Sequence, residues 1–124
     1  MKRLSIESVI DMHSALIQET GGMDGVRDMN LLDASVNSPY HTFDGIYLYP
    51  TLPAKAAHLA FSLIKNHPFL DGNKRIGILV MLVFLDSNGL PVTTADEELI
   101  SLGLGLAENT IDESVLIDWI IAHG

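Results

Sequence analysis

The chain has 124 residues, of which 48% are hydrophobic and 19% are charged. This balance excludes a disordered chain and predicts one folded domain over residues 1–124, because a chain of this length buries roughly two-thirds of its unfolded surface. The absence of cysteine excludes disulfide frameworks, thiolate zinc sites and cysteine nucleophiles, and it favours the cytoplasm as the compartment. Seven basic against sixteen acidic residues give a net charge of −9, which opposes direct binding to DNA or to an anionic membrane.

Two helices are predicted before residue 40. Apolar residues recur at helical spacing over residues 6–17, after a possible cap at Ser5, and a glycine pair ends the pattern. A shorter helix is expected over about residues 29–36, with Asp28 or Asn30 as its cap.

A small β-flap is predicted over residues 40–50. Aromatic and β-branched residues flank Asp44-Gly45, a dipeptide that tolerates the positive φ angles of a tight hairpin turn. Thr51, followed by a proline in the first turn, then begins a third helix. This helix is expected to end at His67, because the next residue is proline.

A fourth helix is predicted over about residues 74–87. Its apolar residues point in all directions, which is typical of the central helix of a domain. The longest apolar run, over residues 76–85, is about half of the roughly 20 residues that a membrane span needs. No apolar signal-peptide stretch follows the first residues, so we expect neither secretion nor a membrane anchor.

Two capping boxes predict two further helices. Thr94 precedes Glu97 by three residues, and Thr110 precedes Glu113 in the same way. Nothing outside the flap predicts a strand. The sequence therefore indicates an all-α domain of about six helices with one small β-hairpin.

Basic residues gather in one stretch of the chain. Between residues 46 and 80 lie Lys55, Lys65, Lys74 and Arg75 against the single acid Asp71, a local balance of 4 − 1 = +3. We expect one basic patch that binds an anion. The alternative is that the lysines only solvate a helical face.

The motif segment, HPFLDGNKR at residues 67–75, holds more reactive groups than a connection between two helices requires. A loop that enters a helix amino terminus presents unpaired N–H groups and the positive end of the helix dipole, and both attract phosphate. Gly72 permits a close approach of backbone to anion, and Lys74 and Arg75 add positive charge. This pattern predicts a nucleotide phosphate site.

Four other residues in or near the motif segment have two interpretations each. Asp71 either holds Mg²⁺ beside phosphate or caps the fourth helix. His67 either accepts a proton from an attacking hydroxyl or is structural, and its neighbours favour the first. Asn73 bonds phosphate or the backbone of the segment itself, and Lys65 reaches phosphate or only water. Phe69 is predicted to anchor the segment in the core.

The motif segment resembles the signature of the Fic/Doc family, His-x-Phe-x-Asp/Asn-Gly/Ala-Asn-Lys/Gly-Arg, and it matches every fixed position. The resemblance covers roughly residues 20–90. The order and spacing of the matching segments outside the motif resemble those of the Doc branch. The other matching segments are GVRD at 25–28, LL at 31–32, TF at 42–43, LYP at 48–50 and KAA at 55–57.

The resemblance implies an all-α fold in which the motif links two central helices and a β-flap overlies the active site. It also implies that His67 is a base, that Asp71 binds Mg²⁺ and that the following residues form an anion hole for ATP. Fic enzymes generally transfer AMP from ATP to a protein hydroxyl. Doc toxins transfer the γ-phosphate, act as kinases on elongation factor Tu, and are silenced by an antitoxin protein.

Two departures from the Fic signature favour the Doc branch. Lys74 stands where Fic enzymes have glycine, and Ile78 stands where they have a second arginine. We therefore expect a nucleotide bound in the reversed sense, with its γ-phosphate nearest His67. The pair Asp71-Gly72, by contrast, is closer to the Fic pattern. The self-inhibitory pattern of some family members has no convincing copy here, so inhibition is expected from a separate antitoxin.

The sequence thus predicts a toxin that phosphorylates a serine or threonine of a translation factor. Three alternatives stay open: AMP transfer, a non-catalytic nucleotide-binding interaction module, and a transition-metal site at His67 and Asp71. The flap has two interpretations as well. It either binds an extended target segment by strand addition, with the hydroxyl at His67, or only covers the core.

Overall fold

Six α-helices and one short hairpin make up the fold in the computed structural model, which describes residues 1–124. The elements in chain order are α1 (Ile6–Thr20), α2 (Met29–Asn37), the 3₁₀ turn η1 (Ser38–Tyr40), β1 (Thr42–Phe43), β2 (Ile46–Tyr47), α3 (Leu52–Asn66), α4 (Asn73–Ser87), α5 (Asp96–Ala107) and α6 (Glu113–His123). The predicted all-α class with a single hairpin is confirmed.

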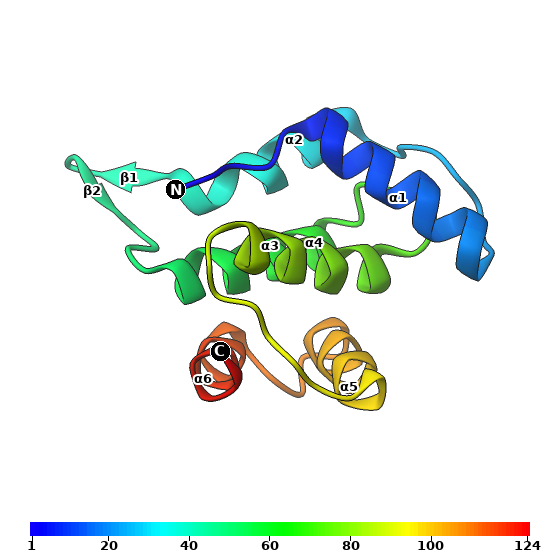
Figure 1. The fold of residues 1–124 in the computed structure, drawn as a ribbon. Helices are drawn as coiled ribbons and strands as arrows, with labels where there is room; N and C mark the ends of the chain where they lie inside the picture. The colour runs from blue at the N-terminus through cyan, green and yellow to red at the C-terminus, as the bar shows by residue number, and fades with distance from the viewer.

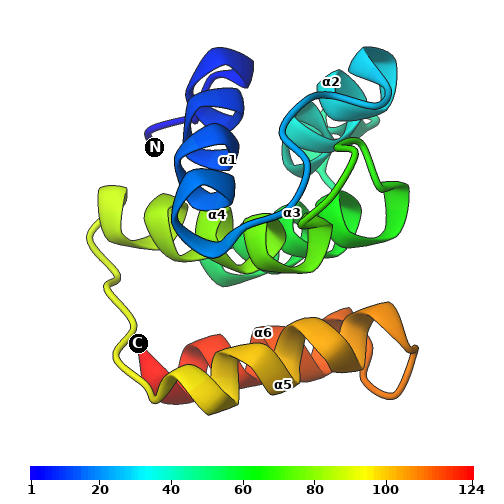
Figure 2. The ribbon, with the colours of Figure 1, turned by 90° about the vertical axis from the view of Figure 1, so that its right-hand side faces the viewer.

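The helices lie in three layers (Figure 1). The pair α3 and α4 forms the middle layer, α1 and α2 cover one side of it, and α5 and α6 cover the other. The view turned by 90° shows the same order, with α5 and α6 below the central pair (Figure 2). The motif segment joins α3 to α4 and therefore lies at one end of the middle layer.

The core follows from the apolar residues of the central pair. Ile76, Val80, Met81 and Phe84 of α4 have no exposed surface, which confirms the prediction that this helix is central. Helices on both sides of α4 cover its apolar surface, so the burial extends around it. None of the six helices has both the length and the apolar character that a membrane-spanning segment needs.

Three helices begin where the sequence predicts. The hydroxyl of Ser5 accepts a hydrogen bond from the Ser8 N–H at 3.0 Å and caps α1. Asp28, rather than Asn30, caps α2 by accepting from Leu31 N–H at 3.0 Å. Thr51 caps α3.

Both predicted capping boxes are wrong, although the two helices exist. The residue before α5 is Ala95, which makes no side-chain cap, and Thr94 donates its hydroxyl to the Glu98 carboxylate at 2.6 Å. Three acids in the first turn of α5 stabilise its amino terminus through the helix dipole instead. Asp112, not Thr110, caps α6, because its carboxylate lies closer to the free N–H groups of that helix.

The hairpin is confirmed, but its predicted place over the motif segment is wrong. β1 and β2 pair antiparallel, and the turn residues Asp44 and Gly45 have φ angles of 53° and 76°. The hairpin leads into the first turn of α3, whereas the motif segment follows the last turn (Figure 1). A helix of 15 residues separates the two by about 22 Å.

Candidate functional site

His67 ends α3 in a left-handed conformation. Its φ and ψ are 48° and 55°, values that few residues other than glycine adopt. The Arg27 guanidinium donates from Nε to the His67 carbonyl at 2.6 Å and from a terminal nitrogen to the Asn66 carbonyl at 2.9 Å. A cation at the carboxyl end of a helix is favourable, so Arg27 stabilises the turn that carries the imidazole.

The α1–α2 connection, residues 21–28, holds the rest of the motif segment by its backbone. The N–H groups of Arg27 and Asp28 both donate to the Pro68 carbonyl, at 2.8 and 3.0 Å. The Leu70 N–H donates to the Gly25 carbonyl at 3.0 Å. The shape of the motif segment therefore depends on residues that lie some 40 positions earlier in the chain.

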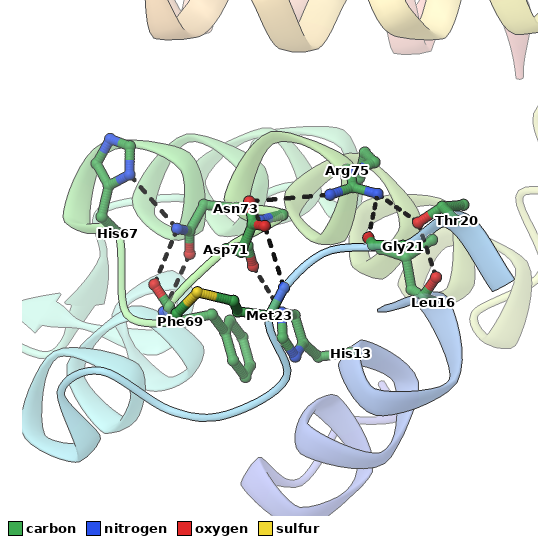
Figure 3. A network of polar contacts seen from close by, with 11 residues as sticks. His13, Leu16, Thr20, Gly21, Met23, His67, Phe69, Asp71, Asn73 and Arg75 are labelled. Carbon is green, nitrogen blue, oxygen red and sulfur yellow. Dashed lines mark hydrogen bonds and ion pairs between the residues drawn. The ribbon is translucent and has the colours of Figure 1, made fainter. Parts of the chain in front are cut away.

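Phe69 anchors the motif segment in the core, as predicted. Its side chain is 1% exposed, and its ring stacks on the buried ring of His13 at a centroid distance of 3.8 Å (Figure 3). His13 also lies 2.7 Å from the Asp71 carbonyl through Nε2. Because a carbonyl only accepts, Nε2 of His13 carries the hydrogen.

Asn73 bonds the backbone of the motif segment. Its Oδ1 accepts from the Phe69 N–H at 3.0 Å, and its Nδ2 donates to the Phe69 carbonyl at 3.1 Å. The same Nδ2 lies 3.4 Å from Nδ1 of His67. Asn73 thus sets the position of the imidazole, whose other nitrogen lies on the far side of the ring (Figure 3).

The Asp71 carboxylate does not cap α4. Gly72 occupies the cap position, and no side chain caps this helix. Instead one Asp71 oxygen accepts from the Gly72 N–H at 2.8 Å and the other from the Met23 N–H at 3.1 Å. These two N–H groups, helped by the nearby Arg75, lower the pKa of Asp71 below its usual value.

Gly22 is what lets the α1–α2 connection come so close to Asp71. A Cβ atom at Gly22 would lie 2.6 Å from the Asp71 carboxylate, and its φ is +117°. No other residue type fits this place without movement of the backbone or of Asp71.

The ionised Asp71 fits a magnesium ligand. Each of its oxygens accepts one hydrogen bond and keeps further lone pairs, and the side chain is 47% exposed. Mg²⁺ in nucleotide sites commonly takes one or two carboxylates, phosphate oxygens and water. A single carboxylate beside a phosphate site is therefore a sufficient protein ligand for Mg²⁺.

Arg75 bridges the motif segment and the end of α1. One terminal nitrogen lies 4.0 Å from Asp71, and the other donates to the Gly21 carbonyl at 3.2 Å and to the Thr20 hydroxyl (Figure 3). Its side chain is 40% exposed and retains donors for a ligand. Lys74 is exposed and makes no hydrogen bond with its ammonium group.

These side chains border one depression of about 420 Å³, which we call the motif pocket. Its lining residues are His67, Leu70, Asp71, Gly72, Asn73, Lys74 and Arg75. The N–H groups of Asn73, Lys74 and Arg75, at the first turn of α4, have no hydrogen-bond partner in the chain. Free N–H groups, a helix amino terminus and two cations on one surface suit a polyphosphate.

The structure does not bring Lys65 into the motif pocket. Its ammonium group donates to the Asn109 side chain and lies 3.5 Å from the Ala107 carbonyl, so it tethers the α5–α6 connection to α3. Lys55 is buried near the other end of α3, where it donates to the Tyr49 carbonyl. The predicted single basic patch is therefore wrong, because the helix distributes residues ten positions apart along its length.

Sequence reasoning missed Arg27, His13 and Gly22 as supports of the motif segment. Arg27 lies in one of the segments that carried the family resemblance, but nothing local to it shows that its guanidinium reaches the end of α3. His13 occupies a position in the apolar stripe of α1, and this position indicates burial but not its partner.

Most of the chain is similar in sequence to known proteins. Residues 3–85 match the Fic/DOC family. "Toxin Doc" of Mycolicibacterium smegmatis is 47% identical over 70 residues, which cover 56% of this chain and 54% of that protein. This match therefore spans about half the length of the relative. "Protein kinase doc" of Escherichia phage P1 is 29% identical over 118 residues, which cover 95% of this chain and 92% of the relative.

The family match covers two-thirds of the chain and includes the whole motif segment, with all the residues that border the motif pocket. The chain belongs to the Fic/DOC family.

Proposed function

We propose that this protein is a Doc-type toxin that acts as a protein kinase in the cytoplasm. It transfers the γ-phosphate of ATP to a serine or threonine hydroxyl of a translation factor of the elongation factor Tu type. A partner antitoxin keeps it inactive. The names of the two relatives, one a toxin and one a protein kinase, support this proposal.

The observation that carries the proposal is the motif pocket. Lys74, Arg75 and the free N–H groups at the start of α4 bind the phosphates, and Gly72 leaves room for their approach. The His67 imidazole borders the same pocket, and it takes the proton of the target hydroxyl. Asn73 contributes by holding the motif segment and the imidazole in place.

The transfer itself requires little covalent help from the protein. The hydroxyl oxygen forms a bond to the γ-phosphorus, the bond from that phosphorus to the β–γ bridging oxygen breaks, ADP leaves, and His67 keeps the hydroxyl proton. Mg²⁺, held by Asp71, neutralises charge on the phosphates when it is bound. The residues of this chain act mainly by positioning and by charge stabilisation.

The side chains around Arg75 favour phosphate transfer over AMP transfer. Ile78 lies one turn along α4, is 7% exposed, and offers no second cation where AMP-transferring members carry an arginine. Lys74 fills space that glycine leaves open in those members. Both differences support a nucleotide whose γ-phosphate lies nearest His67.

Labelled ATP tests the reaction. The chain is incubated with candidate translation factors and with ATP labelled at either the α- or the γ-phosphate. Kinase activity transfers only the γ-label and adds about 80 Da to the target, whereas AMP transfer moves the α-label and adds about 329 Da. Transfer of the α-label would replace the kinase proposal by AMP transfer. Tight ATP binding without any transfer would indicate a nucleotide-binding interaction module.

Toxicity is tested by expression in a bacterial host. The chain alone is expected to arrest growth, and co-expression of the antitoxin is expected to restore it. Normal growth in the presence of soluble wild-type protein contradicts the toxin proposal.

A further inference from the structure

A second pocket, of about 320 Å³, lies between α4 and α5, and we call it the α4–α5 pocket. Its surface is mainly apolar, with Ile78 contributed by α4 and Leu99, Ile100 and Leu104 contributed by α5. Ile100 and Leu104 are 70% and 42% exposed, an unusual environment for such side chains in two consecutive turns of a helix. The volume is within the range of about 300–1,000 Å³ that is typical of small-molecule sites.

The α4–α5 pocket adjoins the motif pocket. Lys74 and Arg75 line both of them, so the two pockets meet at the first turn of α4. The motif pocket is polar and presents free N–H groups and cations. The α4–α5 pocket has no charged lining residue apart from Lys74 and Arg75. A ligand that spans both pockets needs an anionic end and an apolar end.

A missing side chain keeps the α4–α5 pocket open. Gly103 lies on the face of α5 that contacts α4, where a Cβ atom would stand 3.4 Å from Ile78 Cγ1 and 3.6 Å from the Lys74 carbonyl. A single methyl group is therefore tolerated, but a larger side chain would project into the pocket. Glycine in the interior of a helix weakens the helix, so its presence at this place is informative.

We propose that the α4–α5 pocket holds the base of the nucleotide whose phosphates occupy the motif pocket. This inference rests on the proposed function and adds to it the site of base recognition. The base packs between Ile78 and the exposed side chains Ile100 and Leu104, and Gly103 leaves the space for its ring. The triphosphate then passes Lys74 and Arg75 to reach His67.

Binding measurements separate the base site from the phosphate site. The affinities of the wild-type chain for ATP and for inorganic tripolyphosphate are measured by calorimetry at one magnesium concentration. ATP is expected to bind at least about tenfold more tightly, because only ATP fills the apolar pocket. The variant Gly103→Val is expected to remove most of this difference while its affinity for tripolyphosphate stays within about twofold of wild type.

A second pair of variants covers the case in which Gly103→Val does not fold. Ile100→Ser removes apolar surface from the pocket at an exposed position, and Ile121→Ser is the matched control on α6, where the isoleucine is 62% exposed and lines neither pocket. Ile100→Ser is expected to weaken ATP binding about tenfold, and Ile121→Ser is expected to leave it unchanged.

The outcomes distinguish the two proposals. Two results would overturn the base site alone. One is that the wild type binds ATP and tripolyphosphate with equal affinity, and the other is that Gly103→Val and Ile100→Ser both bind ATP normally. In either case the pocket has another occupant, such as a partner protein. Failure of the folded wild type to bind either compound overturns the phosphate site, and with it both proposals.

Discussion

The two ends of α3 are built in opposite ways. At its carboxyl end the motif segment is bound by hydrogen bonds from the α1–α2 connection, and its aromatic residue Phe69 is 1% exposed. At its amino end the hairpin has strands of two residues each, and its aromatic residues Phe43 and Tyr47 are 74% and 50% exposed.

This difference shows which part of the molecule holds the site rigid. Positioning requires groups whose own contacts fix them. Hydrogen bonds from the α1–α2 connection provide such contacts around His67, whereas the strand residues of the hairpin are all exposed. The hairpin therefore does not serve as a wall of the motif pocket. Three of the four predictions below compare a change at one end of α3 with a similar change at the other, and the remaining one tests Arg27 at the carboxyl end.

The largest effect is expected from His67→Ala. Loss of the proposed base should reduce transfer to the protein target by about 10² to 10⁴-fold without loss of the fold. The matched control is His41→Ala, an exposed histidine beside the hairpin, which should keep full activity. Rates are measured with γ-labelled ATP, and the fold is checked by circular dichroism. Full activity in folded His67→Ala would show that this imidazole is not the base.

Two phenylalanines offer a direct comparison of stability. Phe69→Ala should lower the free energy of unfolding by about 3–5 kcal/mol, because it leaves a cavity beside His13. Phe43→Ala in the hairpin should change it by no more than about 0.5 kcal/mol, because the ring is already in water. Urea unfolding of the two variants gives both values. Similar losses for the two variants would mean that the hairpin is packed in solution.

Arg27→Ala should reduce the rate of transfer by about tenfold to 100-fold and leave the affinity for ATP unchanged. The change removes two hydrogen bonds that hold the turn of His67, but it removes no group from the motif pocket. The free energy of unfolding should fall by only about 1 kcal/mol, since the side chain is exposed.

Arg27→Lys is the control for charge. It keeps the positive charge at the end of α3 but loses the two-pronged geometry, so its rate should lie between those of the wild type and Arg27→Ala. A fall in ATP affinity equal to the fall in rate would assign Arg27 to ligand binding instead.

Much of the fold was predictable because its signals are local. Ser5, Asp28 and Thr51 each cap the helix that follows, and Asp44-Gly45 forms the turn of the hairpin. The motif segment was recognisable for the same reason: its residues are consecutive, and the helix that follows brings them to one pocket.

The supports of the site were not predictable, because they depend on contacts between distant residues. The Arg27 guanidinium and the His67 carbonyl belong to residues 40 positions apart. The basic residues show the converse error, since Lys55 and Lys65 are near the motif in sequence but have other partners in space. The length of α3 separates Lys55 from the motif segment, and Lys65, although it lies at the same end as that segment, donates to Asn109 instead.

The smallest expected effect concerns acid stability at the Asp71 carboxylate. The Met23 and Gly72 N–H groups lower its pKa in the folded chain, so ionised Asp71 stabilises the fold above its ordinary pKa of about 4. This contribution is lost as the pH falls through the lower, folded-state pKa. The variant Asp71→Asn should therefore be less stable than wild type at pH 7, and the difference between them should shrink as the pH falls from 5 to 3. Asp44→Asn is the control at the hairpin end, where the carboxylate accepts no hydrogen bond, and thermal unfolding across this pH range measures both variants. A constant difference between wild type and Asp71→Asn would mean that the α1–α2 connection does not hold this carboxylate in solution, and the contrast between the two ends of α3 would be weaker.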